Sequence, residues 1–245
     1  MQNNYSEYED PEYYLRWQNK SWFGKILKRW LEEKKPLLGI IRNFVGGKRG
    51  RLLDIGCGPG LFLKHAQDYF ETYGIDISKW AIKEARISTP KSRLYCGDAL
   101  VEIKKFPKDN FLVVTAFDFL EHMGYPHYLI RHVFKILSAE GIFVLSVPNL
   151  SSLGRKIKEQ NWVGFREETH QSILEKSSWI NLLEKNNFDI LKVTYDYLWD
   201  VPYFCRRCQW LEILFLKAST YLLNLSGINV IPWLGENLII IAKKN

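Results

Sequence analysis

The chain has few cysteines and no segment that resembles a secretory signal. Its four cysteines, Cys57, Cys96, Cys205 and Cys208, are scattered over 245 residues, which argues against a disulfide framework. Residues 1–10 are polar and acidic, without the apolar region of a signal peptide. No internal repeat or low-complexity tract is visible. We therefore expect a globular, cytoplasmic protein in a reducing compartment.

The chain also lacks the dinucleotide fingerprint G-x-G-x-x-G, although it contains a glycine-rich turn. That fingerprint needs glycine at position 61, which is Leu61; the third glycine comes one residue early, at Gly60. Residues 52–60 read as an apolar strand, a turn and the start of a helix. Glycine tolerates positive φ and has no Cβ, so a ligand can approach the backbone and the helix N-terminus there. The spacing favours a ligand other than NAD.

Strand and helix patterns alternate along most of the chain. The predicted strands are 51–55, 72–76, 93–96, 111–117, 141–147, 188–195 and 238–242. The predicted helices are 61–68, 78–87, 126–137 and 172–186, the last with Ser172 as its cap and Glu175 three residues later. This order predicts an α/β fold: a Rossmann-like, mostly parallel seven-stranded sheet with helices on both faces and an antiparallel last strand.

Two segments stand outside this pattern. Residues 10–46 look helical, with a break at Pro36, and we assign 1–46 as a helical extension or lid before a main domain at 47–245. Residues 198–235 form an apolar helical insertion before the last strand. A spanning helix there would place 238–242 across a bilayer from the rest of its sheet. Core or lid packing, contact with a membrane surface and a dimer contact remain the alternatives for this insertion.

The net charge of +7 is unevenly placed. Residues 13–51 contain eleven lysines and arginines and two acids, a local net charge of +9. Such a stretch is a solvated helix face or a surface for an anionic partner, such as phospholipid, a phosphorylated substrate or RNA.

Polar residues follow the predicted strands where ligands bind in an open parallel sheet. Asp76 ends the second strand, 22 residues after Asp54. Gly97-Asp98-Ala99 follows the third strand, and Phe117-Asp118-Phe119-Leu120-Glu121-His122 follows the fourth. An acid at the end of the second strand can accept hydrogen bonds from ribose hydroxyls. Together these residues predict a nucleoside-containing ligand.

Five motifs carry a resemblance to a known family. The runs D-x-G-x-G-x-G (54–60), GIDIS (74–78), CGDAL (96–100), FDFLEHM (117–123) and SVPNL (146–150) resemble the motifs of class I S-adenosylmethionine (SAM)-dependent methyltransferases. The similarity is to the small-molecule group that includes ubiquinone-biosynthesis O-methyltransferases. It covers residues 50–150 well, and 165–197 and 236–244 more loosely.

The resemblance implies a SAM site and S-adenosylhomocysteine as the product. Asp76 would bind the ribose, Asp98 and Ala99 the adenine, and the glycines and Asp54 the methionyl part. The implied cofactor residues are Asp54, Gly56, Cys57, Gly58, Gly60, Asp76, Ile77, Asp98, Ala99, Phe117 and His122.

Methyl transfer from a sulfonium needs orientation, and a base only where the acceptor loses a proton. His122 and His170 are the candidate bases. We expect no metal, because His122, His127 and His132 do not share a helix face and Cys205–Cys208 is a lone C-x-x-C.

The acceptor is the least constrained part of the prediction. We expect a methyl group to reach an oxygen or nitrogen of a small acceptor, with amphiphilic, lipid-linked and glycan-linked acceptors open. RNA or protein methylation is an alternative, although the N-P-P-Y-type motif is absent and a nucleic-acid partner is not favoured; a non-catalytic scaffold is a further one. Peripheral membrane contact through 198–235 and 13–51, and a monomer or homodimer, stay open.

Overall fold

The computed structural model describes residues 35–196 and 231–245. Within them the chain divides into two compact units. Of the described residues, unit 1 contains 35–117, 131–144 and 244–245, and unit 2 contains 118–130, 145–196 and 231–243. The expected helices before residue 35, most of the 198–235 insertion and the Cys205–Cys208 pair lie outside the described residues.

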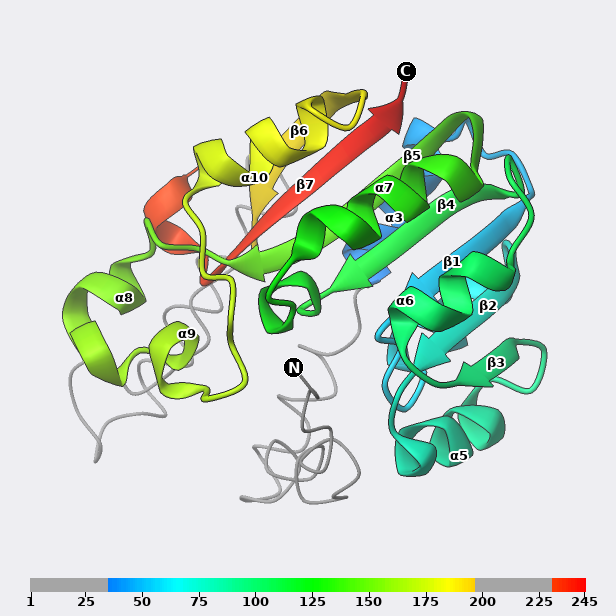
Figure 1. Cartoon of the computed structure of the whole chain (residues 1–245), viewed down its shortest axis with the longest axis horizontal. Helices are drawn as coiled ribbons and strands as arrows, with labels where there is room; N and C mark the ends of the chain where they lie inside the picture. Colours follow the sequence, from blue (N-terminus) through cyan, green and yellow to red (C-terminus); the bar gives the residue numbers. More distant parts are fainter. Residues whose placement is uncertain (1–34, 197–230) are drawn as a thin grey trace. The chain divides into compact units, whose positions relative to one another are not determined.

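Unit 1 contains the first four strands and the helices between them (Figure 1). β1 pairs in parallel with β2 on one side and with β4 on the other, and β2 pairs in parallel with β3. The carboxyl ends of these strands therefore lie at one edge. The elements are α3 Lys35–Phe44, β1 Arg51–Ile55, α4 Leu61–Ala66, β2 Glu71–Asp76, α5 Lys79–Ser88, β3 Arg93–Cys96, α6 Ala99–Glu102, η2 Ile103–Lys105 and β4 Phe111–Phe117.

The core of unit 1 follows from its apolar strands. Leu52, Leu53 and Ile55 of β1 are fully buried, as expected for a strand covered on both faces. Tyr73, Phe106 and Phe111 meet edge to face, with ring centroids 5.1 to 6.0 Å apart. These contacts hold β2 and β4 in place, so the residues that follow them are positioned by a packed core.

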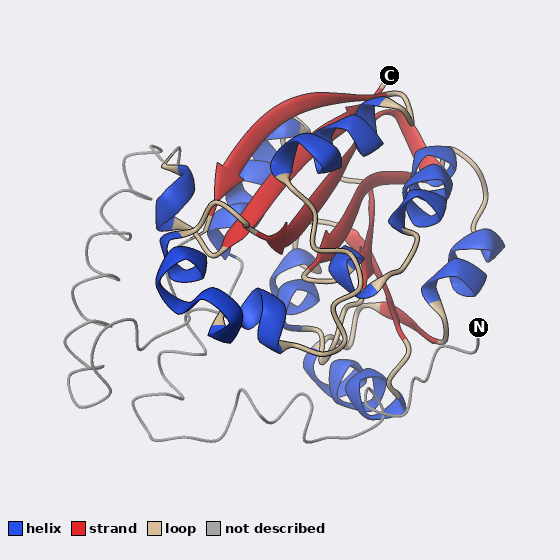
Figure 2. Cartoon of the chain, turned by 60° about the vertical axis from the view of Figure 1, so that its left-hand side comes forward, coloured by secondary structure: helices blue, strands red, loops and turns tan. Residues whose placement is uncertain are grey.

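The remaining elements follow β4. They are η3 Leu120–His122, α7 Pro126–Ile136, β5 Leu137–Pro148, α8 Leu153–Lys158, η4 Glu159–Asn161, α9 Val163–Arg166, α10 Lys176–Glu184, β6 Phe188–Tyr195, η5 Pro232–Leu234 and β7 Asn237–Lys244. The strand order is β3-β2-β1-β4-β5-β7-β6, and β7 runs opposite to β5 (Figure 1). Helices lie on either side of the strands (Figure 2). The predicted mixed seven-stranded Rossmann-like sheet is confirmed.

Local patterns located most elements well. The strands 51–55, 93–96, 111–117 and 188–195 have the predicted bounds, and Ser78 caps α5 by accepting from the Ala81 N–H. The predicted helix 172–186 was wrong at its start, since α10 begins at Lys176 with Glu175 as its cap. Ser172 instead donates its hydroxyl to the Met123 carbonyl, which ties the preceding loop to the segment after η3.

No helix within residues 35–196 or 231–245 combines the length and apolar character that crossing a membrane requires.

Candidate functional site

The turn after β1 has the backbone conformation that its glycines predict. Gly56, Gly58 and Gly60 all have positive φ, at 73°, 50° and 81°. A Cβ on Gly60 would lie 2.8 Å from Thr89 Cγ2, so packing excludes a side chain as well. The Gly56 and Cys57 N–H groups both donate to the Ile75 carbonyl, at 2.8 and 3.0 Å. The turn is therefore a bare-backbone cradle fixed to the end of β2.

Asp76 links this cradle to the next turn. Its Oδ2 accepts from the Gly58 N–H at 2.7 Å, and its Oδ1 accepts from the Ser78 N–H at 2.9 Å. The side chain is buried, so it is oriented by the backbone on both sides. Each carboxylate oxygen can accept more than one hydrogen bond, so Asp76 retains capacity toward ligand hydroxyls.

The other two predicted acids have their own local partners. Asp54 is buried, and its Oδ1 accepts from the Thr115 hydroxyl of β4 at 2.6 Å. Asp98 caps α6 by accepting from the Leu100 and Val101 N–H groups. With Asp76, these acids follow or lie within three neighbouring strands of unit 1. The structure thus brings together the ends of strands that the sequence marks.

Four further residues are predicted to contact the cofactor, and their side chains differ in how far they are exposed to solvent. Burial, with Asp76 and Asp54 nearby, raises the pKa of the Cys57 thiol well above its ordinary value. Cys57 is therefore a neutral packing group rather than a nucleophile. Phe117 is nearly buried and meets Phe62 edge to face at 5.0 Å, while Ile77 and Ala99 are partly exposed.

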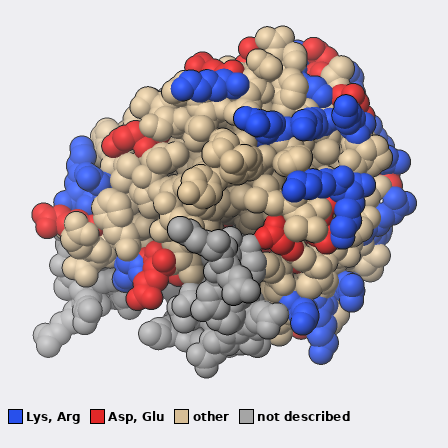
Figure 3. Space-filling model, viewed as in Figure 1, with Lys and Arg blue, Asp and Glu red and all other residues tan. Residues whose placement is uncertain are grey.

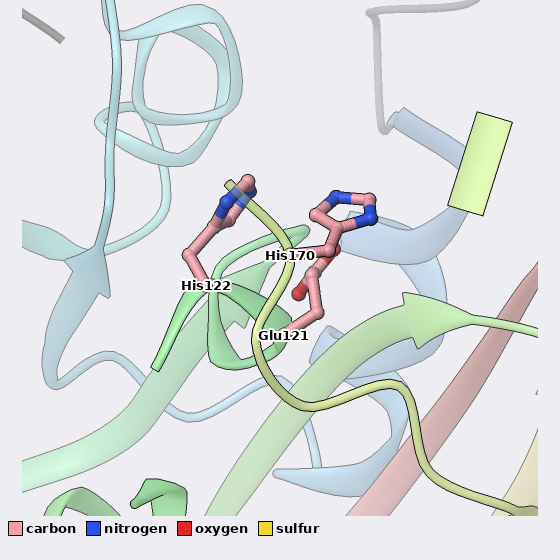
Figure 4. A group of neighbouring side chains, drawn as sticks. All are labelled: Glu121, His122 and His170. Carbon is pink, nitrogen blue, oxygen red and sulfur yellow. The ribbon is translucent and has the colours of Figure 1, made fainter. Parts of the chain in front are cut away.

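The structure pairs the two predicted histidines within unit 2. The rings of His122 and His170 have centroids 4.8 Å apart and meet edge to face, and Figure 4 shows them side by side near Glu121. His122 follows β4 in η3, whereas His170 lies in the loop before α10. Two backbone bonds join these segments, because the Gln171 and Ser172 N–H groups donate to the Glu121 carbonyl at 2.7 and 2.9 Å.

Hydrogen bonds fix the orientation of both rings. His170 Nδ1 lies 2.8 Å from the Gly164 carbonyl oxygen. A carbonyl only accepts, so Nδ1 carries the hydrogen and Nε2 carries the lone pair of the neutral ring. His122 Nδ1 lies 2.9 Å from the Thr169 hydroxyl. Burial, then the neighbouring His170, lowers the pKa of His122 to about 4, so His122 is neutral at pH 7.

The comparisons with known proteins give the family. A family described as "Methyltransferase domain" matches residues 14–193. The chain belongs to the class I SAM-dependent methyltransferases. The ubiquinone biosynthesis O-methyltransferase of Idiomarina loihiensis is 27% identical over 183 residues, which is 66% of this chain and 75% of that protein. The enzyme of the same name from Alkalilimnicola ehrlichii is 29% identical over 142 residues, 52% of this chain and 58% of that protein.

Solved structures agree on the fold. A SAM-dependent methyltransferase from Archaeoglobus fulgidus superposes with a TM-score of 0.64 at 20% identity, over 96% of this chain and all of that one. Phosphoethanolamine N-methyltransferase 2 of Haemonchus contortus, in complex with SAM, gives 0.59 at 20% identity over 86% of this chain and 52% of that one.

The cradle of this methyltransferase suits SAM. A turn with positive φ at three alternate residues, Gly56, Gly58 and Gly60, leaves backbone without side chains for a flexible methionyl chain to approach. Asp76 offers carboxylate oxygens of the kind that hold ribose hydroxyls. When bound, SAM supplies a methyl group already activated on a sulfonium.

The methyltransferase also contains residues to which its sequence assigned no individual role. Asp118 has a positive φ of 51° and is held by Ser146 and Asn237, whose side chains donate to its Oδ1 at 2.7 and 3.0 Å. Thr169 orients His122. Asp118 and Thr169 lie close in sequence to His122 and His170. This closeness is a signal from which both residues could have been predicted. Glu236 is fully buried and accepts from the Trp162 indole at 2.6 Å, a contact over 74 residues that no local pattern indicates.

Glu121, His122 and His170 also raise the question of a metal. Their ligand atoms lie within 4.8 Å of one another, a spacing that the separate treatment of the histidines overlooked. The absence of a metal stays a prediction.

Surface cations of the methyltransferase are spread over several elements (Figure 3). One group surrounds His132 in unit 1: burial first, then Lys135, Lys104 and Arg131, lowers the pKa of this histidine.

Proposed function

We propose that this methyltransferase transfers the methyl group of SAM to an oxygen of a small acceptor, and that His170 Nε2 accepts the acceptor's proton. The carrying observation is the bond from His170 Nδ1–H to the Gly164 carbonyl, which leaves Nε2 as the basic atom. A positioned histidine is the commonest general base at neutral pH. Nitrogen acceptors that lose a proton need the same base.

His122 has a supporting role in this proposal. It is neutral at pH 7, so it presents no positive charge to oppose proton uptake by the adjacent His170. The relatives named as ubiquinone biosynthesis O-methyltransferases support transfer to oxygen on a small, amphiphilic acceptor.

The cofactor assignment is part of the proposal. Gly56, Gly58 and Gly60 cradle the methionyl part, and Asp76 binds the ribose. The adenine would meet the region of Ile77, Asp98 and Ala99. Asp54 and Cys57 would stabilise the glycine cradle, and Phe117 would stabilise it from the end of β4. These roles agree with the positive-φ turn and with the orientation of Asp76.

The acceptor class is tested by supplying SAM with a labelled methyl group to a source-cell extract containing the purified enzyme. Lipid, small-molecule, RNA and protein fractions are then separated. We expect the label in the small-molecule or lipid fraction, and no label in that fraction with heat-inactivated enzyme.

A second candidate acceptor class is RNA, for which the net charge of +9 over residues 13–51 is the motive. Label in the RNA fraction, with binding that weakens steeply as salt rises, would contradict the small-acceptor proposal. Label in the protein fraction alone would contradict it as well.

A further inference from the structure

A second cationic site lies in unit 2, on the segment between β5 and α10. It is a pocket of about 390 Å3 on α8, η4 and α9, lined by Arg155, Lys156, Glu159, Gln160 and Phe165. Its volume is within the range of small-molecule sites. Two cations and one acid give it a positive balance, so an anionic group is the favoured occupant.

Arg155 carries the chemical argument. Its Nε is buried and has no hydrogen-bond partner among the described residues. An unsatisfied buried donor on a charged group is costly, and an oxygen anion would satisfy it. The guanidinium lies over the Phe165 ring, with Cζ 5.9 Å from the centroid. A guanidinium can form paired hydrogen bonds to a carboxylate or phosphate.

The pocket wall is a built structure rather than a loose surface. The Arg155 N–H donates to the Ser152 hydroxyl at 2.9 Å, and that hydroxyl donates to buried Glu236 at 3.0 Å. Trp162 donates to the same Glu236 oxygen and packs against Phe165, with ring centroids 5.3 Å apart. Glu236 thereby fixes both sides of the pocket.

The pocket and the proposed base share the short helix α9. Gly164 accepts from His170, and the next residue, Phe165, lines the pocket. The wall of the pocket and the hydrogen-bond partner of the proposed base are thus adjacent residues of one helix. We propose that Arg155 and Lys156 bind an anionic oxygen group, a carboxylate or a phosphate, carried by the methyl acceptor. This inference rests on the proposed function.

The kinetic test uses three acceptors that share one ring: catechol, 3,4-dihydroxybenzoate and 3,4-dihydroxyphenylphosphonate. We expect the wild-type enzyme to prefer an anionic acceptor by about tenfold or more in kcat/KM. Arg155→Gln should remove most of that preference, measured as the ratio of kcat/KM for the anionic acceptor to kcat/KM for catechol. The benzoate and phosphonate arms show which anion fits. Lys185→Gln, a change of an exposed cation outside the pocket, is the matched control and should keep the preference.

Arg155→Lys distinguishes a bidentate site from simple charge. Lysine keeps the charge but not the planar fork, so we expect an intermediate preference. Circular dichroism of each variant checks that the fold is retained.

A binding measurement separates this inference from the proposed function. Each ring compound is titrated by calorimetry into enzyme saturated with S-adenosylhomocysteine. Tighter binding of an anionic compound to wild type than to Arg155→Gln, by about tenfold, supports the pocket even if no methyl group is transferred, in which case the proposed function fails alone. Equal binding to both enzymes, or no binding of either anion at millimolar concentration, overturns the inference.

Discussion

Asp76 shows how one side chain can organise two turns at once. Its two oxygens accept from Gly58 and Ser78, so the carboxylate ties the glycine cradle to the turn after β2. Sequence spacing identified Asp76 because an acid at a strand end is visible without a structure. The two backbone bonds were not predictable, because they depend on how β1 and β2 pair.

Removing that carboxylate should weaken SAM binding. Asp76→Ala loses two charge-assisted hydrogen bonds as well as any bond to the ribose, and each such bond contributes roughly 1.5–3 kcal/mol. We expect the Kd for SAM, measured by calorimetry, to rise about 10- to 100-fold. Asp68→Asn, which changes only an exposed pair with Lys91, should leave the Kd within error. Equal Kd values for all three proteins would remove Asp76 from the cofactor site.

His122 predicts how stability depends on pH. Its folded-state pKa of about 4 lies below the ordinary value of 6.5, so the unfolded chain binds this proton first as pH falls. The free energy of unfolding should therefore decrease from pH 6.5 to pH 4, by on the order of 3 kcal/mol for this group. Above pH 6.5 His122 is neutral in both the folded and the unfolded chain, so it no longer lowers the free energy of unfolding.

Urea unfolding of the wild type and His122→Gln across this pH window measures that contribution. The variant should show a shallower fall in the free energy of unfolding. An unchanged slope would mean that other groups carry the acid sensitivity.

At the scale of elements, α8 depends on a close approach to Glu236. A Cβ on Gly154 would lie 2.0 Å from Glu236 Oε1, and this carboxylate also holds Ser152 and Trp162. Gly154→Ala should destabilise the fold by about 1–3 kcal/mol, because the buried acid has no room to move.

Gly39→Ala is the matched control for that change. Gly39 lies inside α3 with no atom within 4 Å of a built Cβ, so alanine should stabilise the fold by roughly 0.5–1 kcal/mol. Chemical denaturation of both variants measures whether the free energy of unfolding falls for Gly154→Ala and rises for Gly39→Ala. A Gly154→Ala protein as stable as wild type would contradict the packing role given to Glu236.

The error at α10 is also informative at this scale. Ser172 followed by Glu175 predicts a capping box, yet the helix begins at Lys176. Ser172 uses its N–H and its hydroxyl to bind Glu121 and Met123. These contacts, about 50 residues away in sequence, keep the loop extended and place His170 beside His122. Ser172 therefore forms these tertiary hydrogen bonds instead of capping a helix.

At the scale of the whole molecule, the predictable part was the alternating strand and helix order. The strands of the sheet, from residue 51 to residue 244, and the glycine cradle after β1 arise from local patterns in the sequence. The pairing of His122 with His170 and the wall around Glu236 arise from contacts between distant segments, which a single sequence does not reveal.

The whole enzyme also tests the expectation that no metal is used. Dialysis against EDTA, followed by metal-free assay buffer, should leave kcat and KM unchanged. Loss of activity that Mg²⁺ or Zn²⁺ restores would make Glu121, His122 and His170 ligands and would contradict the expectation.

The central claim is that His170 acts on the acceptor and not on SAM. The measurement that tests it most directly is steady-state kinetics of His170→Gln, paired with calorimetric SAM binding, on the acceptor identified by labelling. We expect kcat to fall roughly 10²–10⁴-fold, with the Kd for SAM unchanged. A variant with wild-type kcat, or one that loses activity only because it no longer binds SAM, would contradict it.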